Sequence, residues 1–339
     1  MAEQEVSKED QKTRSPQKYI RQKRTVSNIF GRYGILIVAL VLFGFFSVMV
    51  PEFMTLTNIF IILRQSSILG LLALGLGVII IIGEFDISFE AIAVFCGVIP
   101  VILIMRGVDN LFVVWTIAIA FGVGLSLVNA ASVIYGGIPS FIATLGMMTV
   151  LSAISLGLTG GRDTYPAVFP HGFSILGRYM IGGLIPFPVV IFIAAAIILI
   201  LLLDYSPIGR YIYAIGGNPQ ASLHVGINVK KVKLIAFIIA GLLLGIGGIT
   251  LSSMLNVCNS NMGRNFFLPG VTTCFLGATF LKEGVHNPRG TVVAAILLAI
   301  LANGFSMNNV PFFARDIIQG AILLVAIGML AIIRKKQTG

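Results

Sequence analysis

Long apolar segments recur along this chain and constrain its fold more than any other feature. Of its 339 residues, 57% are hydrophobic and only 11% are charged, whereas a soluble domain carries about 25% charged residues. A helix needs about 20 apolar residues to cross a bilayer, and segments near that length follow one another towards the C-terminus. The short alternating strands of an outer-membrane barrel are not evident. The sequence therefore predicts an all-α, polytopic membrane protein.

We expect about ten transmembrane helices, with eight as the lower limit because the third, eighth and ninth segments are short. The expected spans are Tyr33–Val50, Ser66–Ile82, Ala91–Met105, Leu111–Tyr135, Phe141–Leu158, Ile181–Leu203, Leu234–Met254, Leu268–Leu281, Thr291–Ala302 and Asp316–Ile333. Short spans beside glycine or proline are typical of broken helices that line a cavity. Residues 33–333 are expected to form one transmembrane domain, since no linker or internal repeat divides them.

Lysine and arginine are distributed unevenly among the predicted loops. The polar N-terminal arm, residues 1–32, holds eight of the 23 basic residues, and its low apolar content predicts disorder. If this arm is cytoplasmic and the chain crosses ten times, the basic loops 204–233 and 282–290 and the tail 334–339 are cytoplasmic as well. The basic residues left on the outer side are Arg64, Arg106, Arg162, Arg178, Arg264 and Arg315. This asymmetry follows the positive-inside rule and predicts that both termini lie in the cytoplasm.

The net charge of +10 is therefore explained by the orientation of the loops in the membrane and by contact with anionic membrane lipid. No clustered basic and aromatic surface indicates a nucleic-acid partner.

The motifs of catalysis and of nucleotide hydrolysis are missing. The sequence has no Gly-x-x-x-x-Gly-Lys-[Ser/Thr] phosphate loop and no His or Cys pair at metal-ligand spacing. We therefore expect no enzyme activity, no bound cofactor and no metal in this chain. The central parts of the spans also lack Asp, Glu, Lys and His, which disfavours a proton relay. Sodium could still be held by backbone carbonyl groups.

A polar insert, residues 206–233, interrupts the apolar segments. Asn218 can cap a helix N-terminus, Pro219 suits the first helical position, and Gly226 can adopt the left-handed conformation that ends a helix. These signals predict a short helix from Pro219 to about Val225. A helix of this length is marginal alone, and no partner for it is obvious within the insert, so we expect a second protein to bind it.

Several segments also match known motifs in order and spacing over roughly residues 50–330. They are Pro51–Gln65, Gly83–Glu90, Ile138–Thr149, Leu158–Arg162, Gly216–Val229, Gly277–Thr279, Gly290–Thr291 and Leu301–Gly304. Through them the chain resembles the ribose/galactoside-type sugar permeases of ATP-binding-cassette importers. It departs from the family pattern at Glu84 and Glu90, where glycines are expected, and at Phe267 and Pro269, where an acidic pair is expected. These departures suggest a divergent branch and leave the solute open.

The resemblance implies a permease subunit of the bacterial inner membrane that translocates a small polar solute, most simply a monosaccharide. An extracytoplasmic binding protein would deliver the solute, and a second permease copy or paralogue would complete a dimer. Separate cytoplasmic ATPase subunits would hold ATP and Mg²⁺ and drive alternating access. The residues expected to dock on the ATPase are Gly217, Asn218, Pro219, Ala221, Ser222, Leu223 and Gly226.

Uncharged polar residues within or beside the spans are candidates for the solute pathway. They are Asn58, Gln65, Asn129, Thr144, Thr149, Asn303 and Gln319, to which the resemblance adds Asp86. For Asn129, Asn303, Thr144 and Gln65 the alternative is hydrogen bonding between helices. For Asp86, with Glu84 and Glu90, the alternative to a pore or gating role is a solvated turn at the membrane surface. A glycine-rich run, Gly241–Gly248, is expected to allow close helix packing.

Other functions stay open at this point. A nucleoside or branched-chain amino-acid permease of the same broad fold is the nearest alternative. An ion-coupled secondary carrier or a channel would belong to another class, and a scaffold without transport activity is a third. Transport by the purified chain alone, driven by an ion gradient, would favour the carrier.

Overall fold

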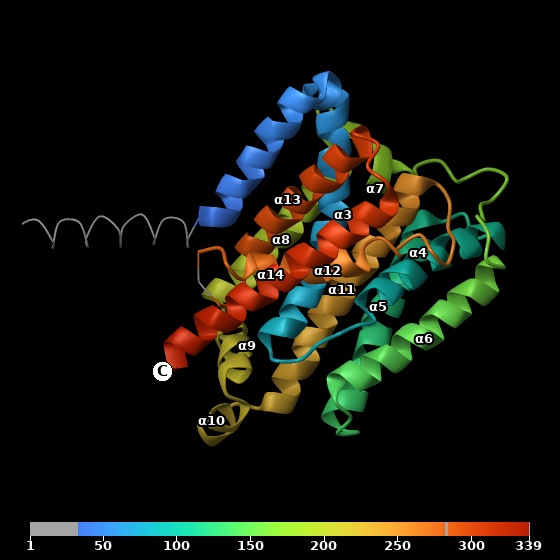
Figure 1. Cartoon of the computed structure of the whole chain (residues 1–339). Helices are drawn as coiled ribbons and strands as arrows, with labels where there is room; N and C mark the ends of the chain where they lie inside the picture. The colour runs from blue at the N-terminus through green and yellow to red at the C-terminus, as the bar shows by residue number, and fades with distance from the viewer. Residues whose placement is uncertain (1–32, 282–283, 339) are drawn as a thin grey trace, which may run out of the picture.

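The computed structural model describes residues 33–281 and 284–338. Over these residues the chain forms a bundle of helices (Figure 1). The same residues include one two-stranded hairpin. The N-terminal arm predicted for residues 1–32 lies outside the described residues.

The described part begins with an apolar helix, Tyr33–Met49, and a 3₁₀ helix, η1 (Pro51–Met54). The longer helices that follow are α3 (Leu56–Ile81), α4 (Phe89–Met105), α5 (Leu111–Ile134), α6 (Ser140–Thr159), α8 (Phe187–Tyr205), α11 (Val229–Leu255), α12 (Phe267–Gly277), α13 (Pro288–Met307) and α14 (Phe312–Thr338). Shorter elements lie between them: α7 (Ile175–Arg178), β1 (Met180–Ile181), β2 (Ile185–Pro186), α9 (Pro207–Gly217) and α10 (Pro219–His224).

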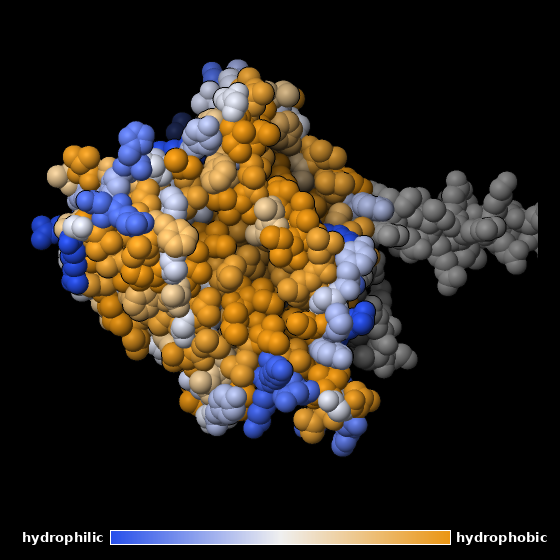
Figure 2. Space-filling model, turned by 180° about the vertical axis from the view of Figure 1, so that it is seen from behind, coloured by the Kyte–Doolittle hydropathy of each residue, from blue (hydrophilic) through white to orange (hydrophobic). Residues whose placement is uncertain are grey.

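Each of the ten predicted spans contains an apolar helix in the described part of the chain. Seven helices, α3, α5, α6, α8, α11, α13 and α14, are long and apolar enough to cross a membrane. Three shorter apolar helices are Tyr33–Met49, α4 and α12. Hydrophobic side chains cover most of one face of the molecule, and hydrophilic ones gather at its edges (Figure 2). An all-α polytopic membrane protein is confirmed.

Several predicted boundaries were wrong. The helix expected from Ser66 begins at Leu56, because the side chain of Thr55 accepts a hydrogen bond from the backbone N–H of Asn58 and caps it. The ninth span was expected to be short, but α13 has 20 residues, starting at Pro288 after an Asn287 cap. The sixth span begins at Phe187 and not at Ile181, because residues 180–186 form the β1–β2 hairpin.

Glycines allow the central helix α11 to approach its neighbours closely, as expected from the run Gly241–Gly248. A β-carbon placed on Gly248 would lie 2.0 Å from the carbonyl oxygen of Ala93 in α4. One placed on Gly241 would lie 2.5 Å from the carbonyl oxygen of Gly122 in α5. Real β-carbons do not fit at such distances, so only glycine permits this packing, which is the usual role of small residues between membrane helices.

Loops predicted to share a side of the membrane do meet in the fold. At one end, Arg289 pairs with Asp204 at 2.7 Å, joining the start of α13 to the end of α8. At the opposite end, Arg178 donates to the carbonyl oxygens of Met254 and Leu255 at 2.7 and 3.0 Å. The ten-crossing arrangement of loops is therefore consistent with the fold. That the end holding α9 and α10, at the bottom of Figure 1, faces the cytoplasm stays a prediction.

Candidate functional site

A short capped helix protrudes at the end of the molecule predicted to be cytoplasmic. The Asn218 side chain accepts from the backbone N–H of Ala221 at 3.0 Å, and Pro219 occupies the first helical position. Gly226 has φ of +82°, the left-handed conformation that ends helices. The predicted helix therefore exists, as α10, and ends at His224. We call residues Asn218–Gly226 the coupling hook.

The coupling hook does have a packing partner within its own insert, contrary to expectation. Helix α9 precedes it and packs against it, while Ile212 and Ile215 of α9 are fully buried against the bundle. Helix α9 starts with its own cap, in which Ser206 Oγ accepts from the Gly209 backbone N–H at 3.1 Å. The Ser-Pro pair at residues 206–207 and the apolar spacing that follows are the signal that was missed.

The hook nevertheless keeps an apolar tip exposed. Leu223 is 58% exposed and Val225 is 76% exposed, whereas Ser222 is buried and its hydroxyl donates to the Asn218 carbonyl oxygen at 2.9 Å. One side of α10 thus holds the hook together, and the other side presents hydrophobic side chains at the polar end of the molecule. Exposed apolar side chains on a rigid element suit a protein contact.

A cavity of about 590 Å³ lies beside the base of the hook. Its walls come from the end of α3, the loop after α3, the start of α6, the end of α9 and residues 284–286. Polar groups in the wall include Glu84, Ser140, Tyr213 and His286. The cavity therefore adjoins the segment that leads into the hook.

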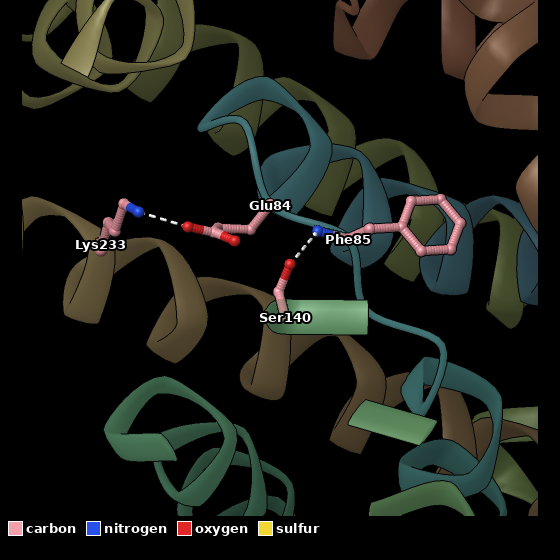
Figure 3. Close-up of polar contacts among 4 residues, drawn as sticks. All are labelled: Glu84, Phe85, Ser140 and Lys233. Atoms are coloured by element: carbon pink, nitrogen blue, oxygen red, sulfur yellow. Dashed lines mark hydrogen bonds and ion pairs between the residues drawn. The ribbon is translucent and has the colours of Figure 1, made fainter. Parts of the chain in front are cut away.

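Two polar contacts fix the loop between α3 and α4 at this cavity (Figure 3). Glu84 forms an ion pair with Lys233. The Glu84 side chain is 13% exposed and the Lys233 side chain is 19% exposed. The backbone N–H of Phe85 donates to Ser140 Oγ at 3.1 Å. Because Lys233 lies in the first turns of α11, directly after the hook, the ion pair connects the hook to the α3–α4 loop.

Asp86 lies two residues further along this loop and is fully buried. Its Oδ1 accepts from the backbone N–H and the hydroxyl of Ser88 at 2.8 and 2.6 Å, and Asn129 of α5 donates to the same hydroxyl at 2.8 Å. Burial raises the pKa of Asp86 to about 6, against the lowering effect of the Ser88 and Asn129 hydrogen bonds. The alternative of a solvated turn was wrong for Asp86, because Ser88 and Asn129 draw it into the bundle.

The other buried pathway candidates are hydrogen-bonded between or within elements. Asn303 of α13 donates to the Asn58 side chain at 2.9 Å, and Asn58 donates to the Phe53 carbonyl oxygen at 2.9 Å. Thr144 of α6 accepts from the Ile87 backbone N–H at 3.0 Å. None of the three lines the cavity beside the hook. Hydrogen bonds between two helices, or between a helix and a neighbouring loop or turn, account for what they contact.

The remaining candidates differ in exposure and setting. Gln65 is half-buried on α3 and Gln319 is half-buried on α14. Thr149 is exposed on α6, and its hydroxyl donates to the Leu145 carbonyl oxygen at 3.0 Å. A role for any of these candidates in the pathway stays a prediction.

Replacing Asn303 by leucine should lower stability more than it lowers transport per folded molecule. The change leaves the buried Asn58 carbonyl group without a donor, at a cost of about 1–3 kcal/mol. Replacing both residues by leucine removes the orphaned side-chain carbonyl but also takes the Asn58 donor away from the Phe53 carbonyl oxygen, so it should restore only part of the lost stability. Thermal unfolding of the purified variants, with uptake normalised to membrane abundance, measures both effects. A loss of normalised uptake at unchanged stability would contradict the structural role and favour the pathway.

Removing the Glu84–Lys233 ion pair should weaken the link between the hook and the α3–α4 loop. Glu84→Gln and Lys233→Gln should each lower solute uptake several-fold, since each leaves a partly buried charge without its partner. The charge swap, with Lys at 84 and Glu at 233, should recover part of the loss. Uptake in vesicles at matched protein abundance checks this. A swap as inactive as the single variants would show that the charges do not act as a pair.

Comparison with known proteins points to one family. Residues 58–327 match the family model described as branched-chain amino acid transport system / permease component. A ribose import permease of Bacillus subtilis is 32% identical over 282 residues, covering 83% of this chain and 87% of the relative. A xylose transport system permease of Haemophilus influenzae is 31% identical, covering 87% of this chain and 94% of the relative.

An L-arabinose ABC transporter permease of Azospirillum brasilense is 30% identical, covering 91% of this chain and 89% of the relative. No solved structure matches the chain. The family match covers most of the chain, and the relatives align over most of their own length. This chain therefore belongs to the permease family of ATP-binding-cassette importers, as a multi-pass protein of the bacterial inner membrane.

Proposed function

We propose that this chain is the permease subunit that imports a monosaccharide. The relatives are named as permeases for ribose, xylose and L-arabinose, which supports this solute class. The observation that carries the proposal is the apolar tip of the coupling hook, exposed at one end of a membrane bundle. Such a tip fits a groove on a separate motor protein, in the manner of a helix bound in a groove.

The proposed assembly has three kinds of partner. Cytoplasmic ATPase subunits bind the coupling hook and hold ATP and Mg²⁺, so that this chain needs no cofactor or catalytic group of its own. An extracytoplasmic binding protein delivers the sugar at the opposite end. A second permease copy or paralogue completes the path, and both termini lie in the cytoplasm.

The fold offers a physical route from the hook to the bundle. A β-carbon on Gly216, at the end of α9, would lie 1.8 Å from the Ile81 carbonyl oxygen of α3, so α9 and α3 are in direct backbone contact. On the other side of the hook, the Glu84–Lys233 ion pair joins α11 to the α3–α4 loop. Movement of α10 is therefore transmitted to both α3 and α11. A change between two packed arrangements of these helices gives alternating access.

Reconstitution tests the proposal. The chain is assembled in vesicles with its cognate ATPase and binding protein, and uptake of radiolabelled pentoses and hexoses is followed with and without ATP. Uptake that needs all three components supports the proposal. Uptake of a nucleoside or a branched-chain amino acid instead would replace the solute, and uptake by the chain alone under a sodium or proton gradient would replace the mechanism.

A further inference from the structure

The segment between α11 and α12 folds back along α4. Helix α11 ends at Leu255, and Asn256 takes the left-handed conformation with φ of +55°. A β-carbon on Gly97, in the middle of α4, would lie 2.5 Å from the Met262 side chain. Towards the start of α4, the Phe267 ring stacks on Phe89 with centroids 5.8 Å apart. Residues 262–267 thus run antiparallel to the first half of α4, and α12 begins beside the first turn of that helix.

This arrangement brings charged and polar groups together within an apolar part of the bundle. Glu90 is the only acidic or basic residue in α4. A β-carbon on Gly263 would lie 3.0 Å from its Oε1 atom, so the carboxylate lies directly against the returning segment. Arg264 is the next residue after Gly263, so a positive charge lies close to this carboxylate along the chain. Asn265 follows Arg264, and both side chains are exposed.

Glu90 differs in exposure from its neighbours on α4. Its neighbours on α4, Phe89 and residues 91–98, are all buried, whereas Glu90 is only partly buried. Ionisable side chains within membrane helices face a bundle interior or a water-filled cavity and not lipid. Non-helical backbone at membrane depth is likewise tolerated only where protein covers it or where it lines such a cavity. The first rule applies to the carboxylate of α4 and the second to the backbone before α12. Both place this region against the protein interior or a water-filled cavity and not against lipid.

We propose that Glu90, Arg264 and Asn265, the α4–α12 polar site, contact the solute as it passes. The inference rests on the proposed function and deepens it. A carboxylate accepts hydrogen bonds from adjacent hydroxyl groups, and a guanidinium and an amide donate to the same groups. Because the two charges compensate each other, the site suits a neutral, polyhydroxylated solute and disfavours an anionic one that would compete with Glu90 for Arg264.

Water access is tested first, in the assembled importer in vesicles. Asn265→Cys should react with a membrane-impermeant, hydrophilic methanethiosulfonate at least tenfold faster than Val150→Cys. Val150 lies on the apolar face of α6 and is 54% exposed, so it is the lipid-facing control. The native residues Cys96, Cys258 and Cys274 are buried, which keeps the background low. Equal rates for the two variants would overturn the proposal.

Transport is tested next, with the same assembly. Glu90→Leu and Arg264→Leu should each lower sugar uptake at least tenfold, and Glu90→Gln should recover part of that loss because an amide oxygen still accepts hydrogen bonds. Membrane abundance and co-purification of the ATPase should not change. The control is Glu52→Gln, an exposed acidic residue before α3. Normal uptake in both leucine variants, or a parallel loss of abundance and uptake in all Glu90 variants, would overturn the proposal.

These measurements separate the site from the proposed function. If the wild-type complex imports no pentose or hexose, the sugar assignment fails, and with it the solute chemistry inferred for the site. The cysteine reactivity then decides alone whether the α4–α12 polar site lines a water-filled path. If the wild-type complex imports sugar and Asn265→Cys is unreactive, the proposed function holds and the site is wrong.

Discussion

Replacing Leu223 by aspartate should abolish ATP-driven uptake while leaving the chain folded in the membrane. Leu223 is 58% exposed at the tip of the coupling hook, so the change removes little internal packing. In the proposed complex the new carboxylate enters an apolar groove without a partner. Loss of a buried anchor at an interface costs about 2–4 kcal/mol, which weakens binding of the ATPase about 30- to 1000-fold.

Co-purification of the ATPase and uptake in vesicles measure this effect. Val168→Asp is the matched control, because Val168 is an exposed apolar residue at 82% in the loop after α6, predicted to lie on the opposite side of the membrane. It should bind and transport like the wild type. Wild-type ATPase binding and uptake by Leu223→Asp would refute docking through the hook, and proteolytic access to residues 218–226 from outside the cell would do so as well.

The coupling hook was predictable from sequence because its signals are local. Asn218, Pro219 and Gly226 each act on the backbone within one or two turns, and the structure places all three as expected. Helix α9 was missed although Ser206 and Pro207 carry the same type of start signal. It is only 11 residues long, too short to stand out as a membrane span, and the polar residues around it concealed its amphipathic spacing.

The acidic cluster shows where sequence reasoning stops. Glu84, Asp86 and Glu90 lie within seven positions, yet each has a different environment. Glu84 pairs with Lys233 far along the chain, Asp86 is buried among hydrogen bonds, and Glu90 faces the segment before α12. These differences come from contacts of the α3–α4 loop and α4 with α5, α11 and the segment before α12, and no local pattern encodes such long-range contacts.

Span existence was likewise easier to predict than span limits. Apolar length alone identified all ten helical segments. It could not show that Thr55 starts α3 well before the most apolar stretch, or that α12 begins only after residues 256–266 have returned along α4. Both features depend on caps and on packing with other helices, which override hydropathy at the ends of spans.

Replacing Gly122 by alanine should destabilise the bundle markedly, whereas the same change at Gly124 should not. A β-carbon on Gly122 would lie 2.5 Å from the Gly241 carbonyl oxygen of α11, and one on Gly124 has no neighbour within 4 Å. Both residues lie in α5, so helix propensity favours alanine equally, by about 0.5–1 kcal/mol. Only the first variant must push α5 away from α11, which costs about 1–3 kcal/mol for an overpacked interior.

Thermal unfolding of the two purified variants in the same detergent separates these terms. The Gly122 variant should unfold several degrees below the wild type, and the Gly124 variant at or slightly above it. Equal unfolding temperatures would mean that α5 and α11 do not touch through their glycines.

The contact between α5 and α11 bears on transport as well as on stability. Helix α11 starts directly after the coupling hook, and Asn129 of α5 holds the α3–α4 loop through Ser88. The Gly122 variant should therefore also show lower uptake per folded molecule, because a wider separation of α5 and α11 would weaken the transmission of movement from α11 to α5.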